Sequence, residues 1–115
     1  MSFDQAPTEQ DVLKKLCGHK WFILEYVANE TPVQIESSIK DLYWFKFHDD
    51  ETYTAMFEGD MTSGTYKYNH RKSSIKMEYE PYGSDDISIE FITDQRIELG
   101  GSIYGKDGYM ILERE

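Results

Sequence analysis

Residues 42–57 read LYWFKFHDDETYTAMF, and their pattern decides the fold class. Large apolar side chains occupy every second position on either side of a short acidic turn, Asp49-Asp50-Glu51. On one face they are Tyr43, Phe45 and Phe47 before the turn and Tyr53, Ala55 and Phe57 after it. A period of two is typical of a half-buried β-strand. The stretch therefore predicts two antiparallel strands joined by a tight turn.

The same alternation extends from Gly18 to the end of the chain. We expect about eight short strands, the first near residues 20–27 and the last over residues 109–114. Loops this short join antiparallel neighbours, so the strands form a meander. A flat meander would expose two edges that invite aggregation, and closing the sheet removes both. The sequence thus predicts an all-β fold, an eight-stranded antiparallel up-and-down barrel, and leaves a two-sheet sandwich open as the alternative.

A short helix is predicted before the strands. Thr8 is typical of an N-cap, with Asp11 at the spacing of a capping box, and Gly18 suits the end of the helix. A helix of about two to three turns is not stable alone, so its apolar stripe must pack on the barrel. The stripe consists of Val12, Leu13 and Leu16. Because residues 20–27 are apolar on both faces, we predict that this helix covers the outer face of the first strand and that it plugs one end of the barrel.

Composition and charge limit the classes of function. The chain has 115 residues, with 12 basic and 22 acidic side chains and a formal charge of −10. We expect a flexible leader over residues 1–7 and a single domain over residues 8–115. The charge excludes a broad basic footprint for nucleic acid, and no stretch is long and apolar enough to span a membrane. Cys17 is the single cysteine, and without a recognisable export signal we expect a cytoplasmic protein.

The acidity also permits a function in protein interaction. A strong negative field on a small domain steers a basic protein partner toward it. An acidic inhibitory or adaptor module is therefore one hypothesis. Solubility is the simpler explanation of the same charge, because an excess of Asp and Glu keeps a β-rich protein from associating.

Three stretches together resemble a known family. Residues 16–21 read LCGHKW and lead into the first strand, residues 45–53 read FKFHDDETY, and residues 64–66 read GTY. With the helix, the meander and a late arginine, they are similar to the lipocalin-like (calycin) barrels, and more narrowly to the small bacterial lipocalin-like domains. The resemblance implies that Trp21 packs across the closed end of the barrel and that the Arg114 guanidinium lies over its indole as a cation–π contact.

Aromatic side chains on the inner face indicate a ligand site. A barrel of this size lined by rings can hold a small apolar or aromatic molecule. The predicted ligand-binding residues are Phe45, Phe47, Tyr53, Phe57, Tyr66, Met77, Tyr79 and Phe91. The alternative is that these side chains fill the barrel completely. Glu25 is a candidate polar anchor for the ligand if it faces inward, and only a polar break in the outer face if it does not.

No motif for catalysis, metal binding or cofactor binding is found in the sequence. His19, His48 and His70 lack the spacing of metal ligands, and the acidic turns lack that of a calcium loop. Nucleotide-binding and nucleophile-elbow motifs do not occur either. We therefore predict no enzyme activity, no cofactor and no metal. The weakest alternative is an enzyme built around Glu25, His48 and a tyrosine.

Overall fold

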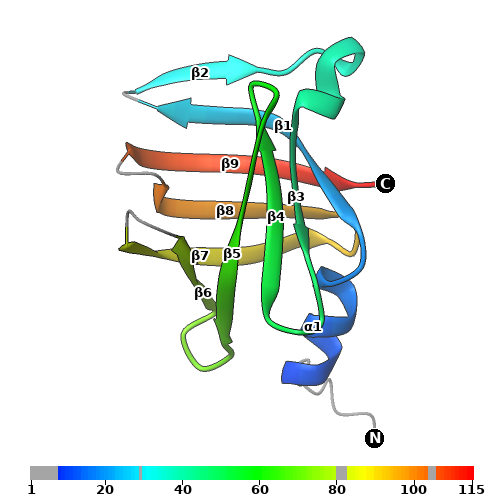
Figure 1. Ribbon diagram of the computed structural model, residues 1–115, viewed down its shortest axis with the longest axis vertical. Helices are drawn as coiled ribbons and strands as arrows, with labels where there is room; N and C mark the ends of the chain where they lie inside the picture. Colours follow the sequence, from blue (N-terminus) through cyan, green and yellow to red (C-terminus); the bar gives the residue numbers. More distant parts are fainter. Residues whose placement is uncertain (1–7, 29, 80–82, 104–105) are drawn as a thin grey trace, which may run out of the picture.

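The computed structural model describes residues 8–115 except 29, 80–82 and 104–105 (Figure 1). The predicted leader over residues 1–7 lies outside the described residues. The elements are α1 (Glu9–Leu16), β1 (Lys20–Ala28), β2 (Thr31–Gln34), the 3-10 helix η1 (Ser37–Leu42), β3 (Tyr43–Phe47), β4 (Thr52–Phe57), β5 (Asp60–Asn69), β6 (Ser74–Tyr79), β7 (Gly83–Thr93), β8 (Arg96–Ile103) and β9 (Lys106–Arg114).

Eight of the described strands close into one barrel. From β3 to β9 each strand pairs with the next in chain order, always antiparallel. Strand β1 pairs with β3 on one side and with β9 on the other, which joins the two ends of the sheet. This ring confirms the predicted antiparallel eight-stranded barrel with a short N-terminal helix, and it excludes the two-sheet sandwich.

Strand β2 and helix η1 lie in a stretch where the sequence predicted no element. Strand β2 pairs with the second half of β1, from Glu25 to Ala28, beyond the point where β3 leaves it. All four residues of β2 are exposed, so the stretch carries no apolar alternation that could reveal a strand. Pro32 fits there because an edge strand has backbone positions that need no N–H donor.

Helix α1 lies at one end of the barrel (Figure 1). Its start is the predicted capping box, in which the Thr8 side chain accepts from the Asp11 N–H and the Asp11 carboxylate accepts from the Thr8 N–H. Val12 and Leu16 are buried, and Leu16 belongs to the barrel core. Lys15 makes a 2.8 Å ion pair with Asp94 in the turn between β7 and β8, which ties the helix across the end of the barrel.

The prediction that α1 covers the outer face of β1 is wrong. That face is covered by η1, which contacts both β1 and β3. The Lys40 ammonium lies 4.8 Å from the centre of the Phe22 ring, and the Lys20 ammonium lies 4.5 Å from the centre of the Trp44 ring. The lysine side chains therefore shield the outer aromatic rings through their stems and through cation–π contacts. The apolar stripe of α1 packs against the end of the barrel instead.

A bulge in β1 decides where Glu25 points. The pairing of β1 with β9 shifts register between Ile23 and Glu25. After the shift, Glu25 lies opposite Ile111, on the outer face, and the Tyr109 hydroxyl lies 3.4 Å from its carboxylate. Tyr26 takes the inward position and packs against the core. Glu25 is thus a polar break in the outer face and not an anchor inside the barrel.

The closed end of the barrel holds Trp21 directly opposite Arg114. The indole is fully buried, donates to the Leu16 carbonyl at 2.8 Å, and meets the Phe91 ring edge-on at 6.2 Å. Arg114 Nη1 lies 3.1 Å from Nε2 of His19. Within the described residues the cation–π contacts are made by lysines, and the stacking of Arg114 on Trp21 that the family resemblance implies is not among them.

Candidate functional site

The predicted ligand-binding residues form much of the barrel core. Their exposed fractions are 0–3% for Phe45, Phe47, Tyr53, Tyr66 and Met77, while Phe57 and Phe91 are partly buried against the same core. The side chain of Tyr79 lies outside the described residues. The rings contact one another: Phe47 stacks on Phe45 at 6.3 Å and meets Tyr66 edge-on at 5.1 Å. These side chains serve one another as packing partners, so a ligand-binding role for them remains a prediction.

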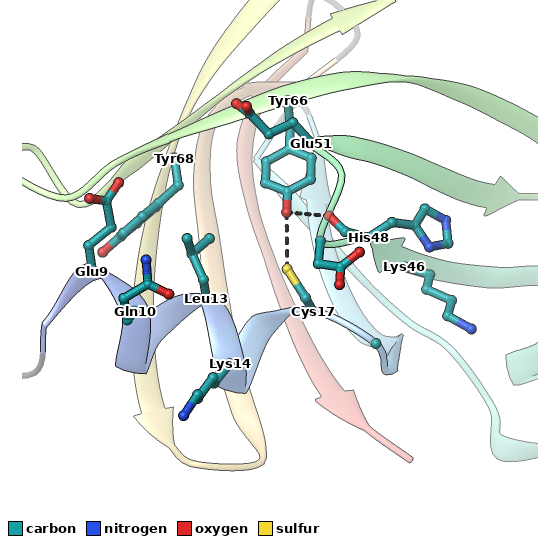
Figure 2. Close-up of a pocket in the computed structure, with 12 residues that line it drawn as sticks. Glu9, Gln10, Leu13, Lys14, Cys17, Lys46, His48, Glu51, Tyr66 and Tyr68 are labelled. Atoms are coloured by element: carbon teal, nitrogen blue, oxygen red, sulfur yellow. Dashed lines mark hydrogen bonds between the residues drawn. The ribbon is translucent and has the colours of Figure 1, made fainter.

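A pocket of about 780 Å³ opens beside α1, where the helix meets the end of β3 and the second half of β5 (Figure 2). We call it the α1 pocket. Its lining residues are Glu9, Gln10, Leu13, Lys14, Cys17, Gly18, Lys46, His48, Asp49, Glu51, Tyr66 and Tyr68. Of the predicted ligand-binding residues, Tyr66 alone lines it. The pocket forms only when a helix at the start of the chain packs beside a strand some fifty residues later, and no local pattern reports that contact.

The floor of the α1 pocket is a short chain of hydrogen bonds. The Tyr66 hydroxyl donates to the His48 carbonyl at 2.6 Å and lies 3.0 Å from the sulfur of Cys17 (Figure 2). The backbone holds these groups in place, because Gly18 N–H donates to the Phe47 carbonyl and a parallel bridge joins Cys17 to Phe47. Cys17 and Tyr66 are therefore fixed partners on a rigid floor.

Both titratable groups on the floor are held in their neutral forms. Burial raises the pKa of the Cys17 thiol. Burial, with the hydrogen bond to Cys17, raises the pKa of the Tyr66 phenol. A thiol is a nucleophile only as the thiolate, and a phenol is a base only as the phenolate. At neutral pH the floor therefore offers a hydroxyl, a thiol and apolar surface for contact.

The raised pKa of Cys17 gives a pH-dependent reactivity. We expect iodoacetamide to alkylate Cys17 of the folded protein more slowly than Cys17 of the chain unfolded in guanidinium chloride, and the folded rate to keep rising at pH values where the unfolded rate has levelled off. The measurement is the alkylation rate followed by intact mass between about pH 7 and pH 10. Equal rates for the two states at neutral pH would contradict the burial of the thiol.

The walls of the α1 pocket carry negative charge close to aromatic surface. Figure 2 shows the Glu51 carboxylate beside the Tyr66 ring and the Glu9 side chain beside Tyr68, while Lys14 and Lys46 extend away from the space between the two tyrosines. Leu13 lies between these two pairs and supplies apolar surface. An organic cation with an apolar body suits this arrangement, because carboxylates and ring faces both attract positive charge.

The histidines and Glu25 do not converge on a site. His48 Nε2 bonds Thr54, His70 Nδ1 bonds the Tyr68 hydroxyl, and His19 bonds Arg114. Lys20 on β1 pairs with Lys46, just before His48, whereas Glu25 lies five residues further along the strand, a separation of roughly 20 Å. Across the described ranges no group of three or more His, Cys, Asp and Glu side chains has the arrangement of a metal site.

Comparison with known proteins supports the fold and nothing finer. No protein-family model and no curated protein matches the sequence. A crystal structure of a DUF4847 family protein from Bacteroides vulgatus ATCC 8482 is similar, with 10% identity, coverage of 89% of this chain and 96% of that one, and a TM-score of 0.61. An NMR structure of a protein from Burkholderia xenovorans has 8% identity, coverage of 100% and 94%, and a TM-score of 0.57.

At such low identity the two structures define a class by shape alone, that of small closed antiparallel β-barrels. The chain is similar to a DUF4847 family protein in this sense. Within the described residues no helix has the length and apolar character needed to cross a membrane.

Proposed function

We propose that this protein is a lipocalin-like binding module whose ligand is a small organic amine with an aromatic or apolar body. The single observation that carries the proposal is the α1 pocket, where apolar floor, two tyrosine rings and carboxylates face one space. Its volume of about 780 Å³ falls in the range of roughly 300–1,000 Å³ that is usual for small-molecule sites. The proposal includes no chemical step, because the thiol and the phenol on the floor are held protonated.

The apolar part of the ligand is assigned to the floor. Leu13, Cys17 and Tyr68 are half-buried, and the edge of the Tyr66 ring completes the surface. An aromatic ring inserted there exchanges water for contact with side chains that are already positioned, at a gain of about 25 cal/mol per Å² of apolar area. Ligand binding costs little side-chain conformational entropy here, because hydrogen bonds already hold Tyr66 and Cys17 in place.

The amine is assigned to the wall that carries Glu51. A cation beside that carboxylate gains from the opposite charge. The formal charge of −10 adds a field that raises the local concentration of cations around the protein. The barrel core is a less suitable place for the ligand, because the inward rings contact one another.

Binding is tested with 2-phenylethylamine by calorimetry at low ionic strength. We expect Glu51→Gln to weaken binding about tenfold, as for the loss of one charge-assisted contact. Glu90→Gln is the matched control, since it removes the same charge from an exposed position on β7 that does not line the α1 pocket. We expect that variant to bind as the parent does. The uncharged analogue 2-phenylethanol should bind more weakly than the amine.

The same pair of variants distinguishes amine binding in the α1 pocket from a second candidate function. An acidic module that recognises a basic protein partner is favoured by the formal charge of −10. If the negative field alone attracts the probe, Glu51→Gln and Glu90→Gln weaken binding equally, which contradicts a site in the α1 pocket. Failure of the amine to bind the parent protein at millimolar concentration contradicts it as well.

A further inference from the structure

A second surface lies at the end of the barrel opposite α1. Figure 1 shows η1 and the turn between β4 and β5 together at that end, with α1 at the other. Three large apolar side chains there are unusually exposed, at 41% for Ile39, 43% for Leu42 and 61% for Met61. Three acidic side chains, Glu36, Glu58 and Asp60, lie next to them in the chain and are also exposed. We call these six residues the η1 patch.

The two parts of the η1 patch are joined by direct contact. In a 3-10 helix, residues three apart lie one above the other, so Ile39 and Leu42 follow one edge of η1, and Glu36 is the N-cap residue just before the helix. The Leu42 carbonyl accepts from the Gly59 N–H at 3.3 Å. The Leu42 side chain reaches the turn, since a Cβ on Gly59 would lie 3.7 Å from Leu42 Cδ2. The apolar edge of η1 therefore continues onto the turn that carries Glu58 and Asp60.

Met61 extends the η1 patch onto the outer face of the barrel. It lies opposite Met56, and Met56 lies opposite Trp44. Trp44 is already covered by other parts of the chain, because its indole donates to the Asp41 carbonyl and the Lys20 ammonium lies over its ring. Folding thus leaves Met61 without a cover, although burying such a side chain is worth about 1.5–3 kcal/mol. Exposed apolar side chains that gather in one place are typical of an interaction site.

The charge of the η1 patch is negative and uncompensated. In the described part of the chain, Glu36, Glu58 and Asp60 form no ion pair. Lys40 is the lysine of η1, and its ammonium is engaged on the Phe22 ring, on the side that faces the barrel. Apolar side chains bordered by free carboxylates fit a partner that carries apolar and basic side chains together.

We propose that the η1 patch binds a basic amphipathic segment of a partner protein. Apolar side chains of the segment cover Ile39, Leu42 and Met61, and its lysines or arginines lie against Glu36, Glu58 and Asp60. The patch is separate from the α1 pocket and shares no residue with it. The proposal therefore does not rest on the function assigned to that pocket.

The test uses fluorescence anisotropy of a labelled synthetic peptide built from Leu and Lys, with the 115-residue chain at low salt. We expect Met61→Ser and Ile39→Ser each to weaken binding about tenfold, from the loss of contact with one apolar side chain. Ile92→Ser is the matched control, because Ile92 is 51% exposed and lies on β7, outside the η1 patch. It should change binding less than about twofold. Binding should weaken at about 0.3 M NaCl, as expected for exposed charges.

A peptide in which every Leu is replaced by Ser, with the same charge, should bind more weakly than the Leu–Lys peptide. Equal binding of the two peptides, or equal loss from Ile92→Ser and Met61→Ser, would show that diffuse charge attracts the peptide and overturns the proposal. No binding to the parent protein overturns it too. The function of the α1 pocket is judged separately, because Met61→Ser should leave 2-phenylethylamine binding unchanged and Glu51→Gln should leave peptide binding unchanged.

Discussion

Replacing Trp21 with alanine is expected to lower the free energy of unfolding by about 3–5 kcal/mol. The indole is fully buried at the closed end of the barrel, so its removal leaves a large cavity inside the barrel at that end. It also leaves the Leu16 carbonyl without its hydrogen bond, and with it one tie between α1 and the barrel. For a domain whose total stability is about 5–15 kcal/mol, such a loss is large.

Urea unfolding followed by circular dichroism measures the loss. Trp21→Phe keeps a ring in the core and removes the Nε1 donor, so its cost should be smaller than that of Trp21→Ala. Phe22→Ala is a useful control, because Phe22 is the next residue in β1 and its half-exposed ring lies on the outer face. If Phe22→Ala destabilises the protein more than Trp21→Ala does, the result contradicts the claim that Trp21 is the main stabilising side chain at the closed end of the barrel.

Replacing Gly64 with alanine is the second large effect that we expect, with a loss of about 3 kcal/mol. A Cβ at Gly64 would overlap the backbone carbonyl oxygen of Glu78, and it would lie 2.9 Å from Cε1 of Tyr53. The Glu78 oxygen belongs to the backbone, so it cannot move away by a side-chain rotation. Strands β5 and β6 must therefore separate at this point, or Tyr53 must leave its buried position in the core.

Gly18→Ala is the matched control for Gly64→Ala. Gly18 has a φ of +84° and no atom within 4 Å of the position of its Cβ, so alanine there meets backbone strain without a collision. That strain costs about 1–2 kcal/mol. Thermal unfolding of the two variants should therefore give the lower midpoint for Gly64→Ala. The opposite order would contradict the close approach of β5 to β6.

The barrel could be predicted because its inner and outer faces differ along most strands. Phe45, Tyr53, Tyr66 and Met77 alternate with polar residues, and all four are buried. Closure of the sheet into a barrel could be predicted because an open sheet would leave two edges free to aggregate. Strand β2 was missed because its residues are exposed on both faces, so no periodicity marks them. The bulge in β1 was missed because no glycine or proline signals it, and that bulge decides the direction of Glu25.

The candidate site could not be predicted in the same way. Leu13, Cys17 and Tyr68 come from distant parts of the chain and line one pocket only after α1 has docked. The helix was predicted to cover the outer face of β1 and to plug one end of the barrel, but no pattern in the sequence indicates which side chains it meets there. In the sequence Leu13 belongs to the same apolar stripe as Val12 and Leu16, and only the structure shows that it stays half-exposed while those two are buried.

The most direct test of the proposed function is where the bound amine lies. Nuclear Overhauser effects from the phenyl protons of 2-phenylethylamine, measured on isotopically labelled protein, report its nearest side chains. If the amine binds in the α1 pocket, we expect contacts with the methyl groups of Leu13 and the ring protons of Tyr66 and Tyr68. Contacts with core side chains such as Ile75 and Met77 would place the ligand inside the barrel and contradict the assignment.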